Sequence, residues 1–215
     1  MTTGQQETRG RFVTLEGGEG AGKSTQISRL KADLESAGVD VVLTREPGGS
    51  EGAEQIRKLL VEGDVGRWQP MTEALLHFAA RADHVDKVVR PALSAGQWVL
   101  SDRFADSTMA YQGYGHGLGA AKINELYQTV LGDFAPDLTI ILDLSVETGL
   151  ARTTGRAGQE DRYERMEVEF HQRLRDGFLQ IAKSEPIRCA VVDASRSEDE
   201  VNSDVRQILR DRLGV

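Results

Sequence analysis

One short segment limits what this chain can fold into more than any other. Residues Gly17-Gly18-Glu19-Gly20-Ala21-Gly22-Lys23-Ser24 fit the pattern G-x-x-x-x-G-K-[ST], between an apolar run at 11–16 and a helical pattern over 25–37. Glycines let backbone N–H groups turn toward a polyphosphate, and the helix N-terminus adds a partial positive charge. In such a loop Lys23 reaches the terminal phosphates and the Ser24 hydroxyl binds Mg²⁺. The segment therefore predicts a nucleoside triphosphate site.

Short apolar runs alternate with helical stretches along the rest of the chain. We expect strands at 11–16, 39–44, 97–101, 138–143 and 189–193, and helices at 25–37, 51–62, 71–95, 119–131, 146–153, 163–184 and 197–213. Strands that read as continuous apolar runs are typical of parallel sheets buried on both faces. The pattern predicts an α/β, three-layer P-loop NTPase fold: a five-stranded parallel sheet covered by helices on both faces, plus a mobile charged flap.

Polar side chains gather where the expected strands end, which is where ligands bind in such sheets. Asp102 ends the run Val99-Leu100-Ser101, and a carboxylate there can hold Mg²⁺ directly or through water. The segment Arg45-Glu46-Pro47-Gly48-Gly49 follows another strand and has an unusual backbone. With Arg57 and Arg103 it suggests a clamp for a second phosphate.

Composition limits the other classes of function. At 215 residues we expect a disordered tail at 1–10 and a single P-loop domain at 11–215. A net charge of −8 argues against broad nucleic-acid binding. The single cysteine, Cys189, cannot form an internal disulfide, and no apolar stretch is long enough to suggest a membrane span. These features predict a soluble, cytoplasmic protein that binds neither nucleic acid nor membrane.

The absence of one sequence motif narrows the class of phosphate acceptor. The chain has no N-K-x-D motif for guanine, so a small-molecule kinase fits better than a GTPase. If the acceptor is itself a phosphate monoester, its oxygen is already ionised and no general base is needed. The enzyme then has only to align two polyanions and neutralise their repulsion. The alternatives are a kinase of UMP or a deoxynucleoside, and a non-catalytic ATP-binding regulatory protein.

Several motifs together resemble the bacterial thymidylate kinase (dTMP kinase) family. After the phosphate loop come Thr44-Arg45-Glu46-Pro47-Gly48-Gly49, Phe78-Ala79-Ala80-Arg81-Ala82-Asp83-His84, Asp102-Arg103-Phe104 with Ser107-Thr108-Met109-Ala110-Tyr111-Gln112-Gly113, and Asp161-Arg162-Tyr163-Glu164. The loop alone names only a superfamily, whereas T-R-E-P-G-G with D-R-F-x-x-S-T-x-A-Y-Q-G is highly specific. The resemblance implies transfer of the ATP γ-phosphoryl group to dTMP, giving dTDP and ADP, with Mg²⁺ bound by Ser24 and Asp102.

The resemblance also implies roles for individual residues. ATP would bind Gly17, Gly18, Glu19, Gly20, Ala21, Gly22, Lys23, Ser24, Thr25 and Arg152, with adenine near the loop after Asp193-Ala194. The dTMP molecule would bind Arg45, Glu46, Arg57, His77, Phe78, Arg81, Arg103, Ser107, Thr108, Tyr111 and Gln112. Within that set Arg57 and Arg103 would hold the phosphate, Glu19 would meet the sugar 3′-hydroxyl, Arg81 would bond thymine, and Tyr111 would disfavour a 2′-hydroxyl.

The flap corresponds to the family's LID, at about 152–165. One class of these kinases carries a catalytic arginine in the phosphate loop, where this chain has none at 18–21, and the other class supplies it from the LID. Arg156 matches that position best and Arg152 is second, while Arg162 and Arg165 could equally be scaffolding. The expected catalytic residues are Lys23, Arg103, Arg156, Glu19 and Asp102. The resemblance also implies a homodimer, through helices that include parts of 71–95 and 119–131.

One position departs from the family pattern. Four residues before Arg81, where the family usually has a phenylalanine that stacks on thymine, this chain has His77, and Phe78 follows it. Either His77 stacks on the base, or the helix is slightly rotated and Phe78 does. If His77 stacks, affinity for dTMP is expected to vary with pH near the histidine titration range.

Overall fold

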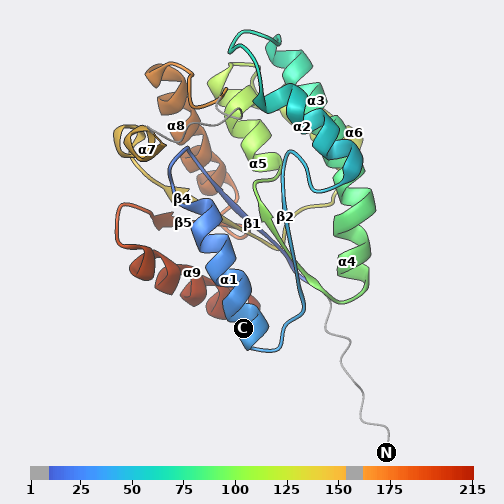
Figure 1. Ribbon diagram of the computed structural model, residues 1–215, viewed down its shortest axis with the longest axis vertical. Helices are drawn as coiled ribbons and strands as arrows, with labels where there is room; N and C mark the ends of the chain where they lie inside the picture. The colour runs from blue at the N-terminus through green and yellow to red at the C-terminus, as the bar shows by residue number, and fades with distance from the viewer. Residues whose placement is uncertain (1–9, 154–161) are drawn as a thin grey trace, which may run out of the picture.

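Five parallel strands form the centre of the molecule. The computed structural model describes residues 10–153 and 162–215. The strands are β1 (Phe12–Gly17), β2 (Val41–Arg45), β3 (Trp98–Asp102), β4 (Leu138–Asp143) and β5 (Cys189–Asp193), and their order in the sheet is β2-β3-β1-β4-β5. Each coincides with an expected strand to within two residues. β1 lies at the centre and is buried along its whole length, because helices cover both of its faces (Figure 1).

Helices pack on the two faces of this sheet and make the three layers. On one face, α1 (Lys23–Ser36) and α9 (Glu198–Leu213) bury Ile27, Leu30, Val205 and Leu209 against β1 and β4 (Figure 1). The other face is covered in part by α8 (Val168–Ser184), whose Phe178 packs near the sheet. Burial of these apolar faces is the main force that holds the layers together. The predicted α/β fold, a five-stranded parallel sheet between two layers of helices, is therefore confirmed.

The remaining helices lie on the second face and around the strand ends. They are α2 (Glu51–Val61), α3 (Pro70–His84), η1 (Val85–Val89), α4 (Arg90–Ser94), α5 (Ala105–Thr108), η2 (Met109–Gly115), α6 (Ala120–Leu131) and α7 (Val146–Thr153). No helix in the described ranges is both long enough and apolar enough to cross a membrane.

The structure differs from the expected helices in three places. The single helix expected at 71–95 contains a π-helical turn, η1, just before Pro91, whose ring nitrogen cannot donate the usual helical hydrogen bond. Residues 105–115, for which no helix was expected, form α5 and η2. The last long helix before β5 begins at Val168 rather than 163, because residues 162–165 are engaged with other parts of the chain.

Candidate active site

The phosphate loop joins the end of β1 to the start of α1. Gly17, Gly20 and Gly22 have positive φ angles of 136°, 68° and 87°, which side-chain-bearing residues rarely adopt. The Nζ of Lys23 donates to the carbonyl oxygens of Gly17 (3.1 Å) and Gly18 (2.8 Å). Burial, with the neighbouring Arg103, lowers the pKa of Lys23 to about 8. The loop therefore holds a poorly solvated cation, to which a phosphate would supply the missing negative charge.

A hydroxyl and a carboxylate meet at the neighbouring strand end. Ser24 Oγ donates to Asp102 Oδ2 at 2.9 Å, across the gap between α1 and the end of β3. Both are hard oxygen ligands of the kind that Mg²⁺ prefers, and Mg²⁺ sites commonly use one or two protein ligands plus substrate phosphates. Within the described residues, no group of three or more His, Cys, Asp or Glu side chains is arranged to bind a metal. The pair fits a magnesium ion that is held mainly by a nucleotide.

A cleft of about 680 Å³ opens over the phosphate loop. Its walls come from the loop, from Asp102 and Arg103, from Arg152 on α7, and from the segment that follows β5. Arg152 Nη1 donates to the carbonyl oxygen of Ala194 at 3.3 Å, which ties α7 to that segment. The lining residues after β5 are Ala194, Arg196, Ser197, Glu198 and Val201. We call this space the donor cleft.

A second cavity of about 120 Å³ lies beside the donor cleft. We call it the acceptor cavity. It shares Glu19, Glu46, Arg57, Arg103 and Glu164 with the donor cleft, so the two spaces meet at these residues. The rest of its lining is Pro47, Val61, His77, Arg81, Phe104, Ser107, Tyr111, Gln112 and Tyr163.

Arg103 occupies the junction of the two spaces. It has a positive φ of 73°, and among the described non-glycine residues it alone adopts this conformation. Its guanidinium donates to Gly17 O (3.0 Å), Ser107 Oγ (3.1 Å) and Glu19 Oε1 (3.1 Å). Tyr111 Oη donates to the same Glu19 oxygen at 2.5 Å. Backbone strain of this kind persists where surrounding contacts fix it, and it is often found at functional sites.

The charges at the junction keep one another ionised. Burial alone would raise the pKa of Glu19, but Arg103 and Lys23 outweigh it and hold that pKa below its ordinary value. Burial would likewise lower the pKa of Arg103, but nearby groups, chiefly Tyr111 and Glu19, raise it. The junction therefore holds fixed positive charge on both sides of one carboxylate, which suits two phosphate groups that approach each other.

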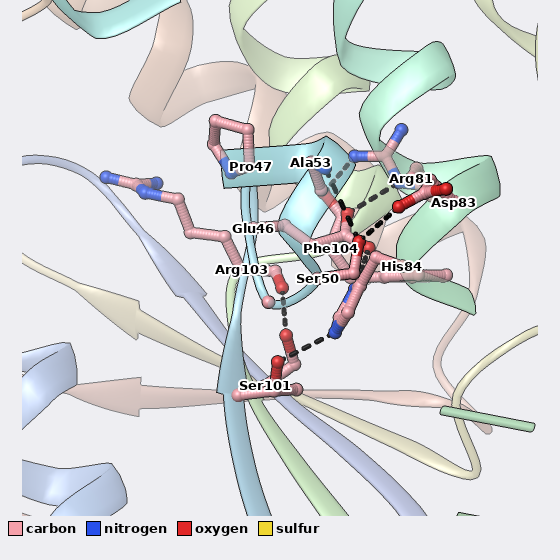
Figure 2. Close-up of polar contacts among 12 residues, drawn as sticks. Glu46, Pro47, Ser50, Ala53, Arg81, Asp83, His84, Ser101, Arg103 and Phe104 are labelled. Carbon is pink, nitrogen blue, oxygen red and sulfur yellow. Dashed lines mark hydrogen bonds and ion pairs between the residues drawn. The ribbon is translucent and has the colours of Figure 1, made fainter. Parts of the chain in front are cut away.

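A second buried cluster orients Arg81 in the acceptor cavity. Glu46 lies between Arg81 and His84, accepting from Arg81 Nε (2.7 Å) and bonding His84 Nδ1 (2.8 Å) (Figure 2). The other ring nitrogen of His84 bonds Thr44 Oγ1 at 2.7 Å. Arg81 Nη2 donates to Phe104 O and Thr108 Oγ1, whereas its Nη1 is buried without a hydrogen-bond partner in the described chain. Arg81, which lines the acceptor cavity, thus has one donor without a partner in the described chain.

Comparison with known proteins agrees with this geometry. The family model for thymidylate kinase matches residues 15–205. The chain belongs to the thymidylate kinase family. It is 53% identical to a thymidylate kinase of Caulobacter vibrioides over 97% of this chain and 100% of the relative, and 52% identical to one of Bradyrhizobium sp. (strain BTAi1), over 95% and 92%. The crystal structure of thymidylate kinase from Ehrlichia chaffeensis superposes with a TM-score of 0.74 at 37% identity, covering 93% of this chain and 98% of that one.

Most residues predicted for a thymidylate kinase site line the two spaces. The phosphate loop from Glu19 to Thr25, together with Arg45, Asp102 and Arg152, lines the donor cleft. Arg57 Nη1 donates to Pro47 O at 2.7 Å and lines both spaces. Arg156, the predicted LID arginine, lies outside the described residues.

Three predicted dTMP contacts do not line the acceptor cavity: Arg45 lines the donor cleft instead, and Phe78 and Thr108 are buried. Phe78 is 1% exposed and packs against Ala74 on its own helix and Ile123 on α6. His77 lines the cavity because it lies one helical turn before Arg81, on the same face of α3. Of the two residues predicted to stack on thymine, His77 lines the acceptor cavity and Phe78 does not. Thr108 is also buried, and its hydroxyl accepts from Arg81 instead of lining the cavity.

Sequence reasoning missed several buried acids and histidines in this thymidylate kinase fold. Glu16, at the end of β1, accepts from Phe104 N (2.7 Å) and Ser107 Oγ (2.6 Å), so it holds the segment after β3 in place. Burial and the nearby Asp106 raise the pKa of Glu16 to about 8. His84 and Glu73 are also completely buried, and neither was given a role. The available signal was the same for all three: an ionisable residue on an otherwise apolar strand or helix face.

Proposed function

We propose that this protein transfers the γ-phosphoryl group of ATP to dTMP, giving dTDP and ADP. The observation that carries the proposal is the junction of the donor cleft and the acceptor cavity at Glu19, Arg57 and Arg103, beside Lys23 of the phosphate loop. A donor bound over the loop and an acceptor bound in the smaller cavity would bring their phosphates together at this point. Membership in the thymidylate kinase family supports ATP and dTMP as the two substrates.

The proposed chemistry requires positioning and charge neutralisation rather than a base. The phosphate of dTMP is already ionised, so its oxygen needs no proton removed before attack. Arg57 and Arg103 would hold that phosphate in line with the donor, and Lys23 would stabilise charge on the transferred group. Glu19 is held between Arg103 and Tyr111 and would accept a hydrogen bond from the sugar 3′-hydroxyl.

The wall of the acceptor cavity supports a role in recognising the base. Arg81 Nη1 would donate to a thymine carbonyl, while Glu46 and Arg45 help to orient the arginines. His77 would stack on the ring. Other polar groups around the base would include Ser107 and Gln112, and Tyr111 would pack on the deoxyribose. Thr108 would act indirectly, through Arg81.

Mg²⁺ would be held by Ser24 and Asp102 together with the donor phosphates. When bound, the ion would neutralise charge on the phosphates and so lower the repulsion between donor and acceptor. Arg152 reaches the donor cleft from α7 and would bind ATP, and we retain Arg156 as the proposed catalytic LID arginine, with the LID at about 152–165. The loop after β5, through Arg196 and its neighbours, would lie beside the adenine.

A panel of acceptors tests the proposal. ADP release with ATP and Mg²⁺ would be measured with dTMP, dUMP, UMP, dCMP, thymidine and no acceptor. Strong preference for dTMP is expected. Preference for UMP or for thymidine would refute the assignment in favour of another small-acceptor kinase, and acceptor-independent ADP release or none would favour an ATP-binding regulatory protein.

We also propose that the protein is a cytoplasmic homodimer with one kinase domain over 11–215. The surface of α3 supports a dimer, because Leu75 remains half exposed on a helix that the proposal places at the interface. The lone cysteine, Cys189, suits a reducing compartment and is buried in β5. Light scattering coupled to size-exclusion chromatography tests the dimer, and a mass near one chain would refute it.

A further inference from the structure

Two segments that are distant in sequence from α3 converge on one buried carboxylate, that of Glu73 in the first turn of this helix. It accepts a hydrogen bond from Gln112 Nε2 (2.7 Å), pairs with Arg162 Nη2 (2.5 Å), and lies 3.4 Å from His116 Nε2. Both Glu73 and Arg162 are 0% exposed. Burial would raise the pKa of Glu73, but His116, His77 and Arg162 reverse that effect and lower it to about 2. The carboxylate is therefore ionised, and Glu73 and Arg162 form a buried ion pair.

Arg162 is also fixed by the backbone at the end of α2. Its guanidinium donates to the carbonyl oxygens of Leu60 (3.0 Å), Asp64 (3.1 Å) and Val65 (2.9 Å). With Glu73 these acceptors engage all three of its nitrogens. An arginine fork bound in this way has little freedom to move, so the chain at residue 162 is held against α2 and α3.

The residue that follows this anchor faces the acceptor cavity. Tyr163 Oη and His77 Nε2 share a hydrogen bond of 2.9 Å, and the Tyr163 ring meets Tyr111 edge to face, with centroids 5.2 Å apart. Burial, then the charge of Glu73, raises the pKa of the Tyr163 hydroxyl well above its usual range, so it stays neutral. The acceptor cavity is lined by Tyr163, His77 and Gln112. Gln112 bonds Glu73 directly, Tyr163 follows Arg162 in the chain, and His77 bonds Tyr163.

We infer that the Glu73–Arg162 ion pair is a positioning unit for the acceptor cavity: it fixes Tyr163, His77 and Gln112 in the arrangement that binds the acceptor base. The inference rests on the proposed function. Neither Glu73 nor Arg162 lines the cavity, so both act through the residues that do. Burying an ion pair costs desolvation, and an apolar pair of similar volume is often as stable. Stability alone therefore does not account for charges at these two positions, whereas the need to orient three polar cavity residues does.

A set of four variants separates positioning from stability. Arg162→Met and Glu73→Leu each leave one buried charge without its partner and are expected to lower the melting temperature. The double variant removes both charges and is expected to melt above the less stable single variant but below the wild type, because the carbonyl oxygens of Leu60, Asp64 and Val65 still lose their donor. Arg165→Met makes the same substitution three residues away, at an exposed side chain that donates to Gly63 O, and serves as the matched control.

The decisive measurements are the dissociation constant of dTMP by calorimetry and the Michaelis constants for dTMP and ATP. In the double variant we expect dTMP to bind about tenfold more weakly, the loss typical of one removed polar interaction, with the ATP constant changed less than twofold. Tyr163→Phe should reproduce part of this loss, and Arg165→Met none of it. A folded double variant that binds dTMP as tightly as the wild type would overturn the inference. Turnover of dTMP by the wild-type protein, measured in the same series, tests the proposed function independently of this inference.

Discussion

Gly20 and Gly149 approach each other backbone to backbone, so a methyl group on Gly20 should destabilise the protein strongly. A Cβ on Gly20 would lie 2.2 Å from Gly149 O and 2.9 Å from Gly149 Cα, and Gly20 also has a φ of +68°. A left-handed backbone costs a side-chain-bearing residue about 1–2 kcal/mol. Forcing a methyl group into a packed contact costs about 1–3 kcal/mol more. Gly20→Ala is therefore expected to cost about 2–5 kcal/mol of unfolding free energy.

The matched control is Gly18→Ala in the same loop. A Cβ on Gly18 meets nothing within 4 Å, and its φ is not in the left-handed range, so a change within about 0.5 kcal/mol is expected. Gly22→Ala separates the cost of the left-handed backbone from the cost of the close contact. Gly22 has a φ of +87°, but a Cβ there would meet nothing within 4 Å. Gly22→Ala should therefore cost only about 1–2 kcal/mol.

The same contact can be approached from α7. A Cβ on Gly149 would lie 2.4 Å from Glu19 O. Alanine in a helix is favoured over glycine by about 1 kcal/mol, so Gly149→Ala would stabilise the protein if the contact were loose. We expect no stabilisation, because the clash offsets the gain in helix propensity.

Thermal unfolding without nucleotide measures all four variants. In a protein of this size about 1 kcal/mol corresponds to about 2–4 °C, so Gly20→Ala should melt about 5–20 °C below the wild type and Gly18→Ala within about 2 °C. The close approach of the phosphate loop to α7 is refuted if Gly20→Ala has the same melting temperature as Gly18→Ala, or if Gly149→Ala melts clearly above the wild type.

Four further predictions concern the site. Lys23→Ala should lower turnover about 10²–10³-fold in the ADP-release assay, because a fixed donor to the transferred phosphate is lost, and near-wild-type turnover would contradict its role. Lys23→Met should stabilise the protein more at pH 7 than at pH 10 in urea unfolding. The pKa of Lys23 is about 8 in the folded protein and 10.5 in the unfolded chain, so between these values the unfolded chain binds more protons and the stability of the wild type rises with pH. An equal gain in stability at both pH values would argue against the lowered pKa. Burial lowers the pKa of His77 to about 4, so the Michaelis constant for dTMP should show no His77 titration between about pH 5.5 and 8, the range around the reference histidine pKa. A transition in this range that the His77→Phe variant abolishes would show that His77 titrates there. Chelation by EDTA should abolish turnover and added Mg²⁺ should restore it, whereas activity that survives chelation would exclude the proposed Ser24–Asp102 site.

Local patterns were enough to predict the sheet and the phosphate loop. The spacing from Gly17 to Ser24 needs only a strand before it and a helix after it, and both can be read from neighbouring residues. β1, β3 and β4 read as apolar runs because helices cover both of their faces, whereas the edge strands β2 and β5 leave Leu43 and Val191 partly exposed. The helix at 105–115 was missed because its two parts are short and rich in residues that do not favour an amphipathic helix pattern.

The acceptor side depended more on tertiary packing. Helical periodicity gives the angle between His77 and Phe78 but not which of the two faces the cavity, and the packing of Phe78 against Ile123 on α6 decides it. Similarly, Arg162 was open to two readings in the sequence, as a LID arginine near the phosphates or as scaffolding. Its contacts with Leu60, Asp64, Val65 and Glu73 make it scaffolding.

The sequence by itself determined the phosphate loop, the five strands in their order along the chain, and the family. Tertiary structure alone decided which buried charges pair, because Glu73 and Arg162, or Glu46 and Arg81, are brought together by the packing of whole helices rather than by any spacing along the chain. A buried charge must find a partner wherever the fold provides one. In this protein those long-range pairs lie in or beside the acceptor cavity, where no local pattern could place them.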